Sequence, residues 1–139
     1  MLDPRITRLA ELLCSHSTQL GPDDRVLINA ADVPPEAVAE VVRVAHSKGA
    51  QVVLRLDSTL VRRQLLMGLT KKNAELIREV ELHEMKQMTA YISLRGANNT
   101  MEQSDVPHDR LSIYDRLVAT PVHLEQRVPH TKWVGLRWP

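Results

Sequence analysis

Short apolar runs alternating with longer helical patterns constrain the fold of this chain more than any other sequence feature. Three of the runs are Arg25 to Ala30 (RVLINA), Gln51 to Leu56 (QVVLRL) and Tyr91 to Arg95 (YISLR). They are too short for buried helices and are typical of strands that are buried on both faces. A fourth strand is predicted from Lys132 to Trp138 near the end of the chain.

The segments between these runs carry helix signals. Asp3 can cap a helix that begins at Pro4, and Gly21-Pro22 follows its end. Thr70 can cap another helix in the same way. The predicted helices cover Pro4 to Leu20, Pro35 to Lys48, Leu60 to Met67, Thr70 to Met88, and a segment that opens at Asp105-Val106-Pro107 and carries Leu111, Tyr114, Leu117 and Val118. The stretch from Pro121 to Pro129 is predicted to be extended or looped.

Strands that alternate with helices favour a parallel sheet with right-handed crossovers. The chain has 139 residues, a length that suits a single core. We therefore predict a single α/β domain over residues 1–139, doubly wound, with a mostly parallel sheet of about four strands flanked by helices. No internal repeat, low-complexity segment or clear linker divides the sequence.

Charge and composition make several partners improbable. Eighteen basic and seventeen acidic residues give a net charge of +1, and the adjacent basic pairs Arg62-Arg63 and Lys71-Lys72 are too short for a polyanion track. Two tryptophans, two tyrosines and no phenylalanine leave little for base stacking, so nucleic acid is not expected as a partner. Neither a membrane-length apolar run nor a signal-peptide core is present, and we expect a cytoplasmic protein that does not enter the membrane. The lone Cys14 is expected to be a buried hydrophobe.

Polar residues follow each predicted strand, at the edge where ligands gather in such sheets. The strongest candidate for a binding segment at this edge is RGANN, from Arg95 to Asn99. A glycine after a strand permits a sharp turn, and the arginine and asparagine side chains can donate hydrogen bonds to a carboxylate or a carbonyl. An ordinary loop, with asparagines bonded to their own backbone, explains it about equally well. The whole edge carries Asn29, Asp32, Asp57, Ser58, Arg95, Gly96, Asn98, Asn99 and Arg137.

The sequence motifs give little support for a nucleotide-binding site or a metal site. The first turn after a strand, NAADVPPEA, has no glycine for a pyrophosphate to approach. Asp32 and Asp57 could pair around a cation, but helix capping is the favoured interpretation. His123, Glu125 and His130 could form a loop site, although ordinary surface histidines are favoured. No metal ligand and no catalytic residue is assigned.

Two C-terminal stretches resemble a known family. They are ISLRGANNTMEQSDVP, Ile92 to Pro107, and PVHLEQRVPHTKWVGLRWP, Pro121 to Pro139. Their I-x-L-R-G-x-x-N, S-D-V-P and T-K-W-x-x-L-R-W-P motifs resemble the N-terminal domain of the thermophilic aminopeptidase family, of aminopeptidase T or S type. The helix and strand pattern from RITRLAELL to AHSKGAQVVLRL fits the same domain, so the resemblance covers essentially the whole chain.

The resemblance implies a longer metallopeptidase that removes single amino acids from peptide N-termini. It implies a pair of divalent ions, of the zinc or cobalt class, which polarise the scissile carbonyl and supply a hydroxide. In the family, all ligands of these ions lie in a second domain, which we expect to be missing here, so this chain alone is expected to be inactive and to bind no metal. The implied partners are peptide substrate in the full-length protein and the absent catalytic domain; whether the chain also forms a homo-oligomer is left open.

The expected role of this domain is to wall the substrate cleft, with Arg95, Asn98, Asn99 and Arg137 facing the cleft or the second domain. A non-catalytic α/β module that binds a small ligand or a protein remains the alternative, and a nucleotide-dependent enzyme is a weaker third. The final strand carries large apolar groups on both faces, so it is either interior to the sheet or awaits a neighbour. We expect pairing to hold Trp133 and leave Trp138 more exposed.

Overall fold

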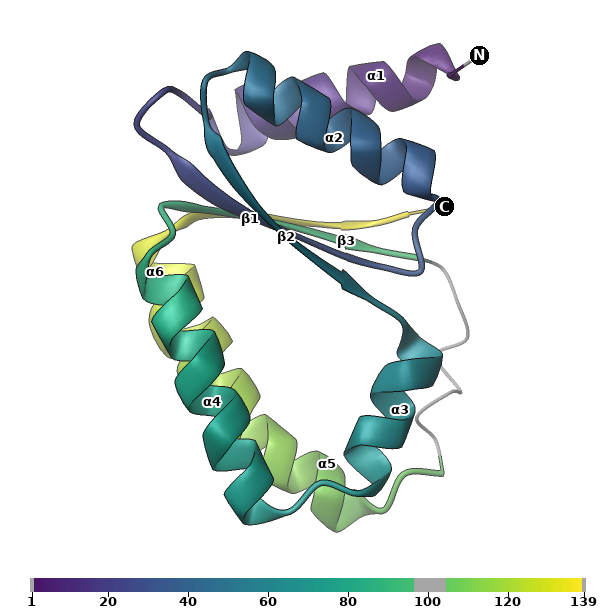
Figure 1. Ribbon diagram of the computed structural model, residues 1–139, viewed down its shortest axis with the longest axis vertical. Helices are drawn as coiled ribbons and strands as arrows, with labels where there is room; N and C mark the ends of the chain where they lie inside the picture. Colours follow the sequence, from purple (N-terminus) through teal and green to yellow (C-terminus); the bar gives the residue numbers. More distant parts are fainter. Residues whose placement is uncertain (1, 97–104, 139) are drawn as a thin grey trace.

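The computed structural model describes residues 2–96 and 105–138, and in these residues four strands form one parallel sheet (Figure 1). The strands are β1 (Arg25–Ala31), β2 (Gln51–Asp57), β3 (Ala90–Arg95) and β4 (Lys132–Arg137), in the order β2-β1-β3-β4. The order reverses at β1, which pairs with β2 on one side and β3 on the other. The predicted α/β class with about four parallel strands is confirmed.

One face of the sheet is covered by the first two helical segments, which lie above the sheet in Figure 1. These are α1 (Pro4–Glu11), which continues as the π-helix η1 (Leu12–Ser17), and α2 (Pro35–Ser47). Alternate strand residues such as Val26, Ile28 and Ile92 pack into this layer. Cys14 is fully buried here, and burial raises the pKa of its thiol to about 11, as expected for a packed hydrophobe.

The remaining helices lie on the other side of the sheet, where α4 runs away from it and α3 and α5 lie farther off (Figure 1). Ser58 caps α3 (Thr59–Met67) through the Val61 amide, and Thr70 caps α4 (Lys71–Lys86) through the Asn73 amide, as predicted for Thr70. The chain then forms α5 (His108–Tyr114), the π-helix η3 (Asp115–Arg127) and α6 (Val128–His130). The core on this face contains Leu27, Leu66, Leu69, Met85, Tyr91, Val118 and Val122.

The prediction of an extended stretch from Pro121 to Pro129 is wrong. Residues 115–127 form η3, and Pro121 lies inside it. Proline breaks a regular α-helix by removing an N–H and crowding the preceding turn, but the wider π-helical turn accommodates it. Val118 and Val122 are almost fully buried in the core that η3 forms with α4, so packing outweighs the local preference.

The expected order of exposure of the two tryptophans is also wrong. Trp133 is 43% exposed, whereas Trp138 is half-buried. In the part of the chain that the structure describes, β4 has β3 as its neighbour on one side and no strand on the other. Trp133 is therefore covered from one side, while the Trp138 amide donates to the Arg95 carbonyl and extends the pairing of the two strands.

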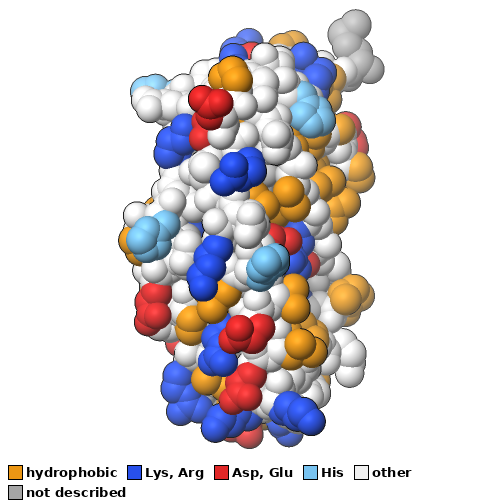
Figure 2. All heavy atoms as spheres, turned by 60° about the vertical axis from the view of Figure 1, so that its left-hand side comes forward, with side chains coloured by type: hydrophobic (Ala, Val, Ile, Leu, Met, Phe, Trp, Pro, Cys, Tyr) orange, Lys and Arg blue, Asp and Glu red, His pale blue; other side chains and the backbone are white. Residues whose placement is uncertain are grey.

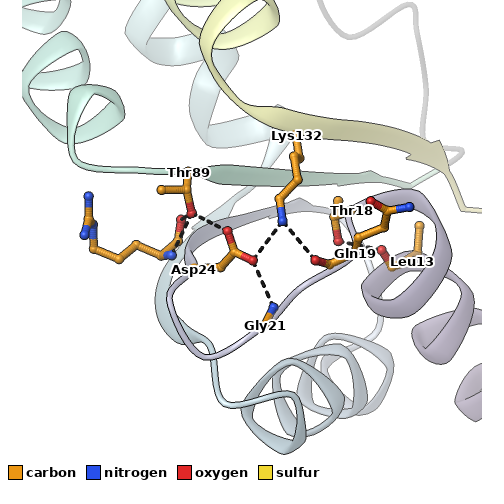
Figure 3. Close-up of polar contacts among 8 residues, drawn as sticks. Leu13, Thr18, Gln19, Gly21, Asp24, Thr89 and Lys132 are labelled. Carbon is orange, nitrogen blue, oxygen red and sulfur yellow. Dashed lines mark hydrogen bonds and ion pairs between the residues drawn. The ribbon is translucent and has the colours of Figure 1, made fainter.

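A hydrogen-bond network centred on Asp24 joins the amino ends of three strands (Figure 3). The Lys132 ammonium at the start of β4 donates to Asp24 Oδ2 at 2.8 Å and to the Gln19 carbonyl at 2.9 Å. Thr89, just before β3, donates to Asp24 Oδ1 at 2.7 Å and accepts from the Arg25 amide that begins β1. The side chain of Asp24 thus sets the relative position of β1, β3 and β4.

The surface carries no broad region of one charge in the view of Figure 2, where basic and acidic side chains are interspersed and hydrophobic ones collect toward the right. None of the helices described combines the length and the apolar character that crossing a membrane requires.

Candidate functional site

The sheet face that meets α4 and η3 changes from apolar to charged along the strands. Parallel pairing brings residues of equal register onto the same face in three rows. The apolar row consists of Val53, Leu27, Tyr91 and Trp133. The polar row consists of Arg55, Asn29, Ser93 and Gly135. The charged row, at the carboxyl ends, consists of Asp57, Ala31, Arg95 and Arg137.

A cavity of about 890 Å³ lies over the polar and charged rows. Its other walls come from α3, α4, α5 and η3, and it reaches the ends of β1 and β3. Those two strands flank the point where the strand order reverses, the usual place for a ligand in an open α/β sheet. The volume lies within the range of small-molecule sites, so we take this cavity as the candidate functional site.

Arginine 127 of η3 is the central cation of the cavity. Its guanidinium lies 3.8 Å from the centroid of the Tyr91 ring, a cation–π contact from the helix to the sheet. Burial lowers the pKa of Arg127, an effect opposed by Tyr91, Glu81 and Glu84. Its Nη1 is 3.4 Å from His123 Nδ1, one turn earlier on η3.

Two carboxylates of α4, Glu81 and Glu84, lie on the side of β2, and Glu81 lines the cavity. Glu84 accepts two hydrogen bonds of 3.0 Å from Arg55 Nη2, and Arg55 is a lining residue. Glu81 has no such partner, and burial raises the pKa of its carboxyl against the opposing effect of Arg55, Arg62 and Arg127. The two acids, three residues apart, therefore have different environments.

Three buried polar atoms of the cavity lining have no hydrogen-bond partner among the described residues. They are Asn29 Oδ1, Glu81 Oε2 and Arg127 Nε. The amide nitrogen of Asn29 donates to the Tyr91 hydroxyl at 3.2 Å, which leaves the other end of the amide free. Buried polar groups are nearly always paired, so an unpaired set of two acceptors and one donor at one place needs an explanation.

His123 lies at the β4 side of the cavity. Its ring meets the edge of Trp133 with centroids 5.4 Å apart. Burial lowers the pKa of His123, and the nearby charges of Arg127 and Arg95 lower it further. The ring thus lies beside Arg127 inside the cavity and within the electrostatic influence of Arg95 at its rim.

The structure places two of the four predicted site residues in this cavity. Arg95 and Arg137 are register partners in the charged row, and both are exposed at the rim. Asn98 and Asn99 lie outside the described residues. Asp32, at the same edge, accepts hydrogen bonds from the Thr59 amide and hydroxyl, which agrees with the helix-capping interpretation.

Sequence reasoning missed the two central residues contributed by helices, Glu81 and Arg127. Neither belongs to a motif, and Arg127 lies in the stretch predicted to be a loop. A signal was present in the strands, because Asn29 and Ser93 interrupt two apolar runs at equivalent positions. A polar row on a face that should be fully buried indicates a site.

A metal site is the other feature to test, since the resemblance implies a pair of divalent ions. Within residues 2–96 and 105–138, no group of three histidine, cysteine or acidic side chains is placed to hold a metal ion. His123 is engaged with Trp133 and Arg127, whereas Glu125 and His130 are exposed. These residues do not fit a metal pair, and we assign none of them a metal role.

Comparison with known proteins establishes the family. The family model described as thermophilic metalloprotease (M29) matches residues 2–136, so the chain belongs to this family, and the family predicted from the motifs is confirmed. A search of curated proteins finds no match.

Among solved structures, wild-type AmpT from Thermus thermophilus is similar, with a TM-score of 0.72 and 14% identity over 98% of this chain and 36% of that one. This chain therefore spans about a third of the length of AmpT, and at this identity the likeness shows the fold alone. A transcription-regulation repressor of the LacI family from Corynebacterium glutamicum matches with a TM-score of 0.36 and 12% identity, over 95% of this chain and 59% of that one, and carries no argument.

Proposed function

We propose that this chain is the N-terminal domain of a two-domain, metal-dependent aminopeptidase that releases N-terminal amino acids from peptides. The observation that carries the proposal is the family match over residues 2–136 together with a fold that corresponds to about a third of AmpT. In this proposal a second domain supplies the metal ligands, because the described residues of this chain do not fit them. The chain alone is inactive, and the complete protein acts on peptides in the cytoplasm.

The surface of the edge strand supports a domain that docks against another. Six large hydrophobic side chains are exposed on β2 and the following helix α3, and we call them the β2–α3 apolar surface: Val53, Leu54, Leu56, Leu60, Val61 and Leu65. Leu54 and Leu56 point to the sheet face of α1 and α2, and Val53 points to the other face, so this surface includes both faces of the edge strand. Exposed apolar groups gathered in this way are typical of interfaces. We propose that the metal-binding domain covers this surface.

Arg95 and Arg137 have a role in this proposal as a wall of the substrate cleft. Both are exposed at the carboxyl edge of the sheet, next to the ends of β3 and β4. Guanidinium groups there can donate to carbonyl or carboxylate groups of a bound peptide. Asn98 and Asn99, which follow in sequence, are proposed to belong to the same wall.

The test is to isolate the protein from its own cells and measure its intact mass and its activity. We expect a mass two to three times the 15.7 kDa of this chain, and release of an aromatic amine from leucine anilide that stops on chelation of divalent metal. In the intact protein, changing Arg95 and Arg137 to alanine should raise KM for peptides more than it lowers kcat.

A native mass of 15.7 kDa, with no metal-dependent activity, would contradict the proposal. The second candidate, a non-catalytic binding module, would then take its place. The cavity at the ends of β1 and β3 is the observation that favours this candidate.

A further inference from the structure

The three unpartnered atoms of the cavity define what a ligand must offer. Asn29 Oδ1 and Glu81 Oε2 are acceptors and require a donor, whereas Arg127 Nε is a donor and requires an acceptor. A purely anionic ligand would satisfy Arg127 but would face the lone pairs of two oxygens. A purely cationic ligand would satisfy the two oxygens but would leave Arg127 Nε without an acceptor.

Charged side chains of both signs line the cavity. Glu81 lies on the side of α4 and β2, where Arg55 and Arg62 are also near it. Arg95 and Arg137 lie at the ends of β3 and β4, where they are register partners. Arg127 interacts electrostatically with Glu81, and its Nη1 is 3.4 Å from His123 Nδ1.

Space is available at the middle of the site. Gly135 occupies the polar row beside Ser93, so no side chain from β4 fills the cavity there. The volume of about 890 Å³ is large enough for a ligand of one to three amino-acid residues.

We propose that the cavity binds a small zwitterion with an α-ammonium and an α-carboxylate, namely a free amino acid or the ends of a short peptide. The ammonium group donates to Glu81 and Asn29, and the carboxylate accepts from Arg127 with Arg95 and Arg137 at the rim. The inference rests on the described residues of this chain and does not depend on the peptidase activity proposed above. A free amino acid and a short peptide both carry these two charged groups.

The test uses the 139-residue chain and calorimetric titration with five probes: alanine, dialanine, N-acetyl-dialanine, dialanine amide and inorganic phosphate. We expect alanine or dialanine to bind, and whichever is tighter identifies a free amino acid or a peptide as the ligand. Acetylation, which removes the ammonium, and amidation, which removes the carboxylate, should each weaken dialanine binding by at least about tenfold. Trp133, which lines the cavity, should report the same titration by its fluorescence.

Variants then assign each end of the ligand. The Arg95→Ala/Arg137→Ala variant should distinguish dialanine from its amide less than the wild type does, and Glu81→Gln should distinguish dialanine from its acetylated form less than the wild type does. Arg8→Ala, an exposed arginine on the opposite layer, should bind like the wild type. Since the rim arginines are exposed, their variant tests the proposal even if Glu81→Gln does not fold.

Three results would each overturn the proposal. The first is a folded chain that binds neither alanine nor dialanine at millimolar concentration. The second is equal affinity for the blocked and free forms. The third is phosphate binding as tightly as either zwitterion, which would make the cavity a simple anion site.

Discussion

At the scale of single residues, the contact between Gly96 and Asp32 fixes the carboxyl edge of the sheet. A Cβ at position 96 would lie 2.1 Å from the Asp32 carbonyl oxygen, which is backbone and cannot rotate away. We predict that Gly96→Ala lowers the free energy of unfolding by roughly 1–3 kcal/mol, measured by urea denaturation. Gly68→Ala, where an added Cβ meets nothing within 4 Å, is the matched control and should lose no stability. Equal stabilities of the two variants would contradict this account.

Glu81 should make stability depend on pH in an unusual direction. Because burial raises its pKa, the folded chain binds this proton more tightly than the unfolded chain does. The resulting stabilisation is complete below the unfolded carboxyl pKa of about 4.3 and is lost as pH rises through the raised value. We predict that the Tm of Glu81→Gln declines less than that of the wild type from about pH 4 upward. The exposed Glu125→Gln should follow the wild type.

Residue-scale features were only partly predictable. Arg95 and Arg137 could be placed at the cavity rim because they end predicted strands, and strand ends share one edge of a parallel sheet. Glu81 and Arg127 could not be placed, because their role depends on which turn of a helix faces the sheet. That is decided by packing between segments distant in sequence.

At the scale of elements, the Asp24 network aligns three strands. Burial raises the pKa of Asp24, but hydrogen bonds from Lys132, Thr89 and the Gly21 amide outweigh it, so the net shift is downward. We predict that Asp24→Asn loses roughly 1.5–3 kcal/mol of unfolding free energy at neutral pH, since its bonds are charge-assisted. Asp23→Asn, an exposed neighbour, should lose little.

The same network makes the free energy of unfolding depend on pH in the direction that is usual for a carboxylate with a lowered pKa. The stabilisation from Asp24 is present above the unfolded carboxyl pKa of about 3.9 and is lost as pH falls through the lowered value. The difference between wild type and Asp24→Asn, measured by thermal unfolding, should therefore shrink below about pH 4. A constant difference down to low pH would exclude the charge of Asp24 as its source.

Elements with strong periodicity or caps were predictable within a few residues, as the caps at Asp3 and Thr70 show. η3 was not, because proline normally ends a helix and the π-helical turn that tolerates Pro121 leaves no local pattern. What keeps η3 helical is the burial of Val118 and Val122, a tertiary effect.

At the scale of the whole molecule, the β2–α3 apolar surface should govern self-association. Leu56 and Leu60 are each 66% exposed. We predict that the isolated chain associates as its concentration rises, measured by sedimentation velocity, and that Leu56→Glu/Leu60→Glu keeps it monomeric. Leu12→Glu, an exposed leucine on η1 that does not belong to this surface, should associate like the wild type. A wild-type chain that stays monomeric at high concentration would argue against a docking role for this surface.

The position of β4 in the sheet has a consequence for how the protein is made. β2, β1 and β3 all lie within the first 95 residues, so a three-stranded sheet can assemble while the chain is still being synthesised. β4 leaves the ribosome last of the four, and with it come Lys132 for the Asp24 network and Arg137 for the rim. Until then β3 is an open edge and the cavity lacks one wall, so the nascent chain passes through a stage in which its future binding site is a surface for unwanted pairing.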